Sequence, residues 1–331
     1  MSTSIVTGAA GFIGSHLVET LLKQGEHVIG IDHFNNYYDP ILKRKNISLF
    51  INHPSFQLIE ADIQLLDWGT LLKGVDVIYH QAAQAGVRAS WGHSFSNYTE
   101  RNINATQVLL EAVKDARHLK RFVFASTSSV YGDAETLPTH ESICPQPVSP
   151  YGITKLAAER LCWLYYKNFG VPFTGLRYFT VYGPRQRPDM AFHKFFKAVL
   201  LGQSISIYGD GQQTRDFTFV SDAIAANLAA AIQPDAVGEI FNIGGGSCVT
   251  LIEVINTIEK IVGRPIRRQH VEPTKGEARH TAADVSKARK ILLYQPQVSL
   301  KDGLAREWDW IQSLAKRAEC DRESKAFILQ L

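Results

Sequence analysis

The chain has 331 residues, of which 45% are hydrophobic and 20% are charged, a composition typical of soluble globular proteins. Its net charge of +3 is small and scattered, so it gives no indication of a nucleic-acid partner. No apolar run approaches transmembrane length and the N-terminus lacks the regions of a signal peptide, so we expect a cytoplasmic protein without a membrane partner.

The cysteines, Cys144, Cys162, Cys248 and Cys320, show neither paired nor metal-type spacing. We therefore expect free thiols in a reducing compartment and no metal site.

The first 32 residues predict a strand, a glycine turn, a helix and a second strand. The turn has the spacing Gly8-x-x-Gly11-x-x-Gly14, and Asp32 ends the second strand. Glycines let backbone N–H groups approach a pyrophosphate at the helix N-terminus, and the acid can hold an adenosine ribose. The acid favours NAD, while nearby Lys43 and Arg44 leave NADP open.

Strands then alternate with helices as far as residue 178. Strands are predicted at 56–60, 75–79, 121–126 and 174–178, and helices at 102–116 and 151–169. This alternation predicts an α/β fold with a Rossmann-type, doubly wound parallel sheet covered on both faces. Sites in such sheets lie at the carboxyl ends of strands, so residues at these ends should converge. They are Gly8, Asp32, Asp62, Ala83 and Thr127.

After residue 180 the chain is richer in turns, several of which precede an arginine. We expect an NAD-binding domain over 1–180, a return segment around 217–243, and a smaller substrate-binding lobe over 181–331. Spaced arginines suit an anionic substrate such as a diphosphate, although any one of them could be a solvated loop residue.

Tyr151 and Lys155 lie four residues apart on a predicted helix and therefore share one face. A neighbouring cation favours the phenolate, so Tyr151 could take a proton from a sugar hydroxyl. Thr127, at the end of a predicted strand, could hydrogen-bond the same oxygen. The pair alone could equally be an ordinary exposed helix face.

Together these motifs and the run from Arg177 to Pro184 resemble the extended short-chain dehydrogenase/reductase family, and more narrowly the NAD-dependent nucleotide-sugar epimerases. The resemblance runs from about residue 3 to about residue 310, and residues 315–331 carry no motif. It implies that Tyr151, helped by Thr127, takes the proton of the sugar C4 hydroxyl while a hydride passes to NAD and later returns to the other face. Lys155 would lower the pKa of Tyr151 and bind the nicotinamide ribose.

The resemblance also implies a set of cofactor contacts. They comprise Gly8, Gly11, Phe12, Ile13, Gly14, Asp32, Asn35, Lys43, Asp62, Ile63, Ala82, Ala83, Gln84, Ser126, Tyr151, Lys155 and Tyr178.

Residues after Thr127 separate three related activities. In the 4,6-dehydratases the matching threonine precedes an Asp-Glu pair, and UDP-glucuronate decarboxylases typically have Glu at the position of Ser129. This chain has Ser128 and Ser129 instead, which favours a 4-epimerase.

The segments 84–88 and 180–190 resemble the UDP-glucuronate 4-epimerases, in which a small residue such as Thr180 leaves room for a carboxylate. UDP-glucuronate to UDP-galacturonate is therefore the predicted conversion; epimerisation of UDP-glucose or UDP-N-acetylglucosamine and UDP-glucuronate decarboxylation are the alternatives. The implied UDP-sugar contacts are Arg88, Ser128, Thr180, Arg185, Met190, Phe192, Tyr208, Arg215, Glu277 and Arg279. Phe192 and Tyr208 could instead pack within the lobe. Relatives usually form homodimers, here through helices 102–116 and 151–169.

Overall fold

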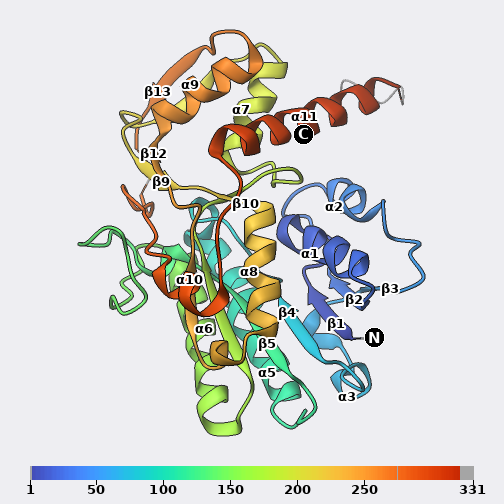
Figure 1. The fold of residues 1–331 in the computed structure, drawn as a ribbon. Helices are drawn as coiled ribbons and strands as arrows, with labels where there is room; N and C mark the ends of the chain where they lie inside the picture. Colours follow the sequence, from blue (N-terminus) through green and yellow to red (C-terminus); the bar gives the residue numbers. More distant parts are fainter. Residues whose placement is uncertain (1, 274, 321–331) are drawn as a thin grey trace.

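The structure, a computed structural model that describes residues 2–273 and 275–320, has a seven-stranded sheet at its centre (Figure 1). All its strand pairs are parallel, in the order β11-β6-β5-β4-β1-β2-β3. Its strands are β1 (Thr3–Thr7), β2 (His27–Asp32), β3 (Phe56–Glu60), β4 (Val77–His80), β5 (Arg121–Thr127), β6 (Phe173–Tyr178) and β11 (Ile240–Ile243). The predicted Rossmann-type sheet is confirmed. The strand order reverses between β1 and β4, where ligands bind in such sheets.

Helices cover both faces of the sheet. On one face α1 (Phe12–Lys23), α8 (Val220–Ile232) and α10 (Ser286–Leu292) pack over the larger of the two main hydrophobic clusters. On the other, α3 (Trp68–Leu71), α5 (Ala105–Val113) and α6 (Pro150–Phe169) bury the second. The helix α2 (Pro40–Ile47) flanks α1, and α4 (Phe95–Tyr98) leads through a π-turn, η4 (Thr99–Asn104), into α5.

A smaller lobe lies beyond the carboxyl ends of the strands and fills the upper part of Figure 1. Three short two-stranded sheets pair β7 with β10, β8 with β13, and β9 with β12. The elements are β7 (Val181–Tyr182), α7 (Ala191–Leu200), β8 (Ile205–Tyr208), β9 (Thr214–Asp216), β10 (Thr218–Phe219), β12 (Cys248–Thr250), α9 (Leu251–Val262), β13 (Arg268–Val271) and α11 (Leu300–Cys320). Single 3₁₀ turns are η1 (Ile63–Leu65), η2 (Arg88–Ser90), η3 (Gly92–Ser94), η5 (Ser128–Val130) and η6 (Pro234–Ala236).

The chain crosses between the two parts more than once. After β10 it returns through α8 and β11 to the large sheet, and it returns again at α10, which packs against β11. The final helix, α11, packs on α7 and α9 of the small lobe, and its Trp310 and Leu314 reach Tyr38 and Leu42 beside α2.

A charged network is buried beneath the carboxyl end of β5. The Arg177 guanidinium on β6 donates to both oxygens of Glu159 on α6, at 2.6 and 2.9 Å. Ser126 donates to Glu159 at 2.6 Å, and a second arm of Arg177 donates to the Tyr131 hydroxyl at 2.7 Å. Because each buried charge is paired and hydrogen-bonded, the network ties α6 to β5 and β6 without an isolated charge.

Cys144, Cys162 and Cys248 are free thiols, and the side chain of Cys320 lies outside the described residues, as do 321–331 of the tail. Among the helices described, none is long and apolar enough to cross a membrane.

Candidate functional site

The glycine turn between β1 and α1 is packed too closely for side chains. Gly8 has φ +70°, and a Cβ there would lie 2.9 Å from the backbone nitrogen of Ala82. A Cβ on Gly14 would lie 2.1 Å from the Gly8 carbonyl oxygen. No side chain caps α1 at Gly11, so its first N–H groups face the end of the sheet, an arrangement suited to phosphate oxygens.

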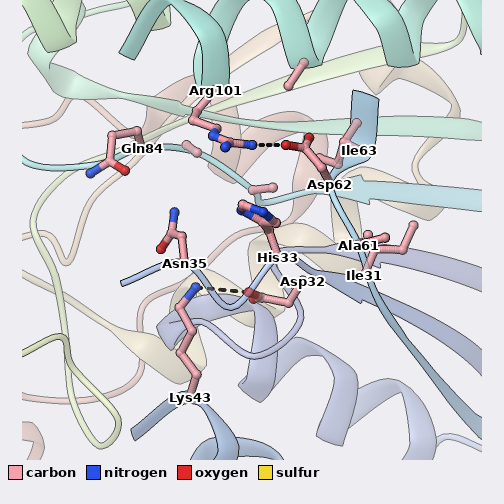
Figure 2. A pocket seen from close by; sticks show the side chains of 14 residues that line it. Ile31, Asp32, His33, Asn35, Lys43, Ala61, Asp62, Ile63, Gln84 and Arg101 are labelled. Carbon is pink, nitrogen blue, oxygen red and sulfur yellow. Dashed lines mark hydrogen bonds and ion pairs between the residues drawn. The ribbon is translucent and has the colours of Figure 1, made fainter. Parts of the chain in front are cut away.

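Asp32 ends β2 and holds both the turn and a lysine (Figure 2). One carboxylate oxygen accepts from the Ala10 N–H at 3.1 Å, and the other accepts from the Phe34 N–H at 2.9 Å and from Lys43 Nζ at 3.0 Å. Arg44 donates to both oxygens of Glu60, each at 2.8 Å. Asp32 would repel a 2′-phosphate, and Lys43, the buried cation beside it, is already paired with that carboxylate, so the site fits NAD.

A pocket opens between Asp32 and the end of β4. Arg101 crosses it to pair with Asp62, which caps η1 through the Gln64 N–H (Figure 2). Nine predicted cofactor residues line the pocket: Gly8, Asp32, Asn35, Lys43, Asp62, Ile63, Ala82, Ala83 and Gln84. Its other lining residues, which sequence reasoning missed, are Ile31, His33, Ala61, Arg101 and Ala105.

The remaining predicted cofactor residues lie around this pocket without lining it. They are Gly11, Phe12, Ile13 and Gly14 at the start of α1, Ser126, Tyr151 and Lys155 near the end of β5, and Tyr178. Ser126 donates to Glu159, and the Tyr178 hydroxyl donates to Asn227 at 3.0 Å.

The residues around 150 determine where α6 begins, and they thereby set the position of Tyr151 in its first turn. The Ser149 side chain accepts from the Gly152 N–H at 3.1 Å, and Pro150 occupies the first helical turn. A Cβ on Gly152 would lie 2.6 Å from the Ser129 carbonyl oxygen, so glycine lets α6 pack directly on the turn after Thr127. Tyr151 and Thr127 are thereby brought close enough for the Thr127 side chain to lower the pKa of Tyr151, while the Thr127 hydroxyl donates to Ser129 Oγ at 3.2 Å.

The pKa of the Tyr151 phenol is raised overall. Burial raises it most, and the Arg187 charge and the Thr127 side chain offset part of that rise. Lys155 was predicted to be the cation that lowers this pKa, and that role stays a prediction. Arg187, which sequence reasoning missed, is a cation that lowers it in the structure. The sequence signal that could have identified Arg187 is its position two residues before Asp189, a carboxylate with which it can pair.

Lys155 is 3% exposed, and its ammonium lies 4.3 Å from the centre of the Phe124 ring. Burial lowers the pKa of this ammonium to about 8, because charge is disfavoured in an apolar environment, while Cys162 and Glu159 oppose the shift. The side chain is therefore directed into the protein beneath the helix.

Asn102 links the pocket to α6. Its side chain accepts from the Gln84 N–H at 2.8 Å and donates to the Thr154 hydroxyl at 2.9 Å. It lies in the π-turn η4, and such turns often occur at functional sites.

Five of the predicted substrate residues form a cluster across the two lobes. The guanidinium of Arg88, on η2, lies 3.8 Å from the Tyr208 ring centre, and its Nε donates to Glu277 at 2.6 Å. Arg215 lies 3.7 Å from the other Glu277 oxygen. Arg279 joins the edge of the cluster, since its carbonyl accepts from Arg215 at 3.0 Å. The Arg279 side chain itself pairs with Asp210 at 2.6 Å, so the guanidinium groups of Arg88 and Arg215 are the ones that can receive an anionic ligand here.

Two other predicted substrate residues lie elsewhere. Arg185 has φ +67° and turns onto α1, where it pairs with Glu19 at 2.6 Å. Phe192 is 1% exposed and packs with Tyr182 and Phe217, so it is part of the lobe's core.

The other three lie at the ends of separate elements. Ser128 begins η5, Met190 precedes α7, and the Thr180 carbonyl accepts from the Thr218 N–H at 3.0 Å.

Residues 4–244 match the NAD dependent epimerase/dehydratase family, so the chain belongs to this family of cofactor-dependent sugar-modifying enzymes. It is 48% identical over 311 residues to the uncharacterized UDP-glucose epimerase YtcB of Bacillus subtilis, covering 94% of this chain and 98% of that protein. It is 38% identical over 315 residues to the UDP-glucuronate 4-epimerase of Thermodesulfobacterium geofontis, covering 94% and 96% respectively.

Among solved structures, the chain is similar to the UDP-glucuronic acid 4-epimerase of Bacillus cereus in complex with UDP-glucuronic acid and NAD. The TM-score is 0.92 at 48% identity, with 94% of this chain and 99% of that chain covered.

Proposed function

We propose that this chain is an NAD-dependent isomerase that converts UDP-glucuronate to UDP-galacturonate by 4-epimerisation. The observation that carries the proposal is the contact of Tyr151 with Thr127 beside a cofactor pocket, with Ser128 and Ser129 following Thr127. A base is present there, while the carboxylic acids that a dehydratase uses for water elimination are absent from those two positions. The two UDP-glucuronate 4-epimerases described above support the sugar assignment.

The pocket residues would hold NAD along its length. The Gly8–Gly14 turn and the N-terminus of α1 would hold the pyrophosphate, Asp32 the adenosine ribose, and Asp62 with Ile63 the adenine. When bound, NAD supplies a hydride acceptor and donor for sugar C4 and a positive charge on its nicotinamide ring.

Tyr151 would take the proton of the C4 hydroxyl and give one back after the sugar has turned over. Thr127 would hydrogen-bond the same oxygen and keep it beside the phenol. Lys155, with a pKa near 8, is mostly protonated at neutral pH and would donate to the ribose of the cofactor. Because burial lowers its pKa, a hydrogen-bond acceptor that reaches this ammonium would stabilise its charged form.

The cluster of Arg88, Tyr208, Arg215, Glu277 and Arg279 would receive the nucleotide diphosphate and ribose, with Thr180 and Ser128 near the uronate carboxylate and Met190 near the base. The cluster is held together by internal ion pairs, which the phosphates would replace. Arg185 and Phe192 would stabilise the surrounding structure without contacting the substrate, since Arg185 pairs with Glu19 of α1 and Phe192 is buried.

Products from UDP-glucuronate and UDP-glucose, incubated in parallel with no added cofactor, test the proposal. We expect UDP-galacturonate from the first and little conversion of the second. UDP-galactose as the main product would instead support a UDP-glucose epimerase, the name carried by the B. subtilis relative. Release of a 4-keto-pentose nucleotide as the main product would support a decarboxylase.

A homodimer formed through α6 is proposed on the exposure of its apolar residues. Ile153, Trp163, Leu164 and Phe169 are each at least 40% exposed. Large apolar side chains exposed along one helix are typical of an interface. Light scattering after gel filtration should give twice the chain mass, and Leu164→Glu should reduce it to that of one chain.

The free thiols of Cys144, Cys162 and Cys248 support a cytoplasmic location.

A further inference from the structure

Three segments that are distant in sequence meet around the side chain of Asp189. Arg187 donates from Nε and Nη2 to the two Asp189 oxygens, both at 2.9 Å. Tyr37, from the segment that follows Asp32, donates its hydroxyl to the same carboxylate at 3.2 Å. A Cβ on Gly86 would lie 2.3 Å from this hydroxyl, so the segment after β4 closes over the cluster and only glycine leaves room for it.

The cluster continues to Tyr151 through Tyr98. The Tyr98 hydroxyl donates to the carbonyls of Ala85 and Gly86, at 3.0 and 2.8 Å. The Tyr98 ring meets the Tyr151 ring edge-on, with 6.2 Å between their centres. A continuous set of contacts therefore joins Asp189 to the residue proposed as the base.

We propose that Asp189 and Tyr37 are positioning residues, which hold the Arg187 guanidinium where its charge acts on Tyr151. The proposal rests on the function proposed above only in calling Tyr151 the base. A bidentate carboxylate fixes the direction of a guanidinium as well as its charge. The Tyr37 hydroxyl fixes the carboxylate in turn, so the cation does not depend on Tyr151 for its place.

The same contacts connect the base to the cofactor pocket. Tyr37 lies two residues after Asn35, which lines that pocket, and the Tyr37 N–H donates to the Asn35 side chain at 3.5 Å. Phe34 donates its N–H to Asp32 at 2.9 Å. A ligand that orders residues 33–38 therefore also orders Tyr37, Asp189 and Arg187.

Several charged or titratable groups face this cluster. Tyr37, Tyr38 and Tyr98 all interact electrostatically with Arg187 and Asp189, and Tyr38 also with Asp32. On the side of Tyr151 the neighbours are Thr127, Tyr98 and Arg187. Burial and Asp189 raise the pKa of Tyr37, so its hydroxyl stays protonated and keeps donating as Tyr151 titrates.

The direction in which the pKa of Tyr151 changes in Asp189→Asn distinguishes a positioning role of Asp189 from a direct effect of its charge. In Asp189→Asn the lost negative charge would by itself lower the pKa of Tyr151. Release of Arg187 from its place would raise it, because a cation stabilises the phenolate only while it is held nearby. We expect the upward shift to dominate, on the order of one pKa unit.

The test is a titration of Tyr151 by NMR of Cζ-labelled tyrosine, in protein saturated with NAD and without any sugar. Tyr151→Phe assigns the signal. We expect an upward shift in Asp189→Asn, a similar one in Arg187→Met, and no further shift when the two are combined, since Asp189 acts through Arg187. Glu19→Gln is the matched control, because it removes the partner of Arg185 in the same segment and should shift nothing.

An unchanged or lowered pKa in Asp189→Asn, a further shift in the double variant, or an equal shift in Glu19→Gln would overturn the proposal. If Asp189→Asn does not fold, Tyr37→Phe serves instead, since it removes no charge and should shift the pKa upward by a smaller amount. The titration needs no turnover, so failure to epimerise UDP-glucuronate would count against the proposed function and leave this result standing.

Discussion

Replacing Arg177 by Met tests how much the buried network beneath β5 contributes to stability. Arg177 is 1% exposed and Glu159 is 0% exposed, and the substitution leaves the Glu159 carboxylate without its cation. Removing one partner of a buried pair costs about 3–5 kcal/mol. With about 2.1 cal/mol/K of unfolding entropy per residue, a loss of 4 kcal/mol lowers the Tm of a 331-residue chain by about 6 °C.

The matched control is Arg44→Met, which breaks an equally short bidentate pair with Glu60 at the surface. Those two side chains are 55% and 47% exposed, and water and salt screen such a pair, so it contributes little to stability. Calorimetric melting of both variants beside the parent protein gives the comparison. If Arg177→Met melts within 2 °C of the parent by this scale, or if both variants lose the same stability, the burial argument is wrong.

Three further predictions concern single side chains. Tyr151→Phe should lower turnover by about 10²–10⁴-fold and leave UDP-sugar binding nearly intact; surviving turnover would show that another group is the base. Thr180→Ala should raise the share of 4-keto-pentose product, because a uronate oxidised at C4 is a β-keto acid that loses carbon dioxide unless its carboxylate is held; an unchanged product ratio counts against this role. Glu307 is buried, accepts from the Gly183 N–H at 2.9 Å, and has a pKa raised well above 4.5 by burial. The protonated carboxyl contributes fully to stability below pH 4.5, and this contribution is lost as pH rises through the folded-state pKa. The Tm of Glu307→Gln should therefore rise relative to that of the parent protein between pH 5 and pH 8. A Tm difference that stays constant over this range would refute the prediction.

The sheet and most of the cofactor pocket could be predicted because both depend on local sequence. The strand at 56–60 and the strand ending at Asp32 have the predicted bounds, since short apolar runs and glycine turns encode them directly. Helix starts were less accurate. The segment predicted as a helix from Asn102 begins at Phe95 and passes through a π-turn, which places Arg101 in the pocket. No hydrophobic period reveals such a turn.

The arginines show where sequence reasoning ended. In the run Gly183-Pro-Arg185-Gln-Arg187, both cations follow a rigid turn, and Arg185 was predicted to contact substrate. The left-handed backbone at Arg185, with φ +67°, directs that side chain onto α1, while Arg187 acts on Tyr151. A backbone conformation that only tertiary packing enforces cannot be deduced from residue types alone.

The course of α11 links the small lobe to the segment that follows the second strand of the large sheet. Swinging the small lobe outward would strip Trp310 and Leu314 from Tyr38 and Leu42 and return that apolar surface to water, at about 25 cal/mol per Å². The contact of Arg88 with Glu277 is 40% and 31% exposed, and an ion pair of that kind contributes no more than about 1 kcal/mol. The helix α11 therefore connects the two halves of the molecule through an apolar contact, to which the exposed ion pair between Arg88 and Glu277 adds little.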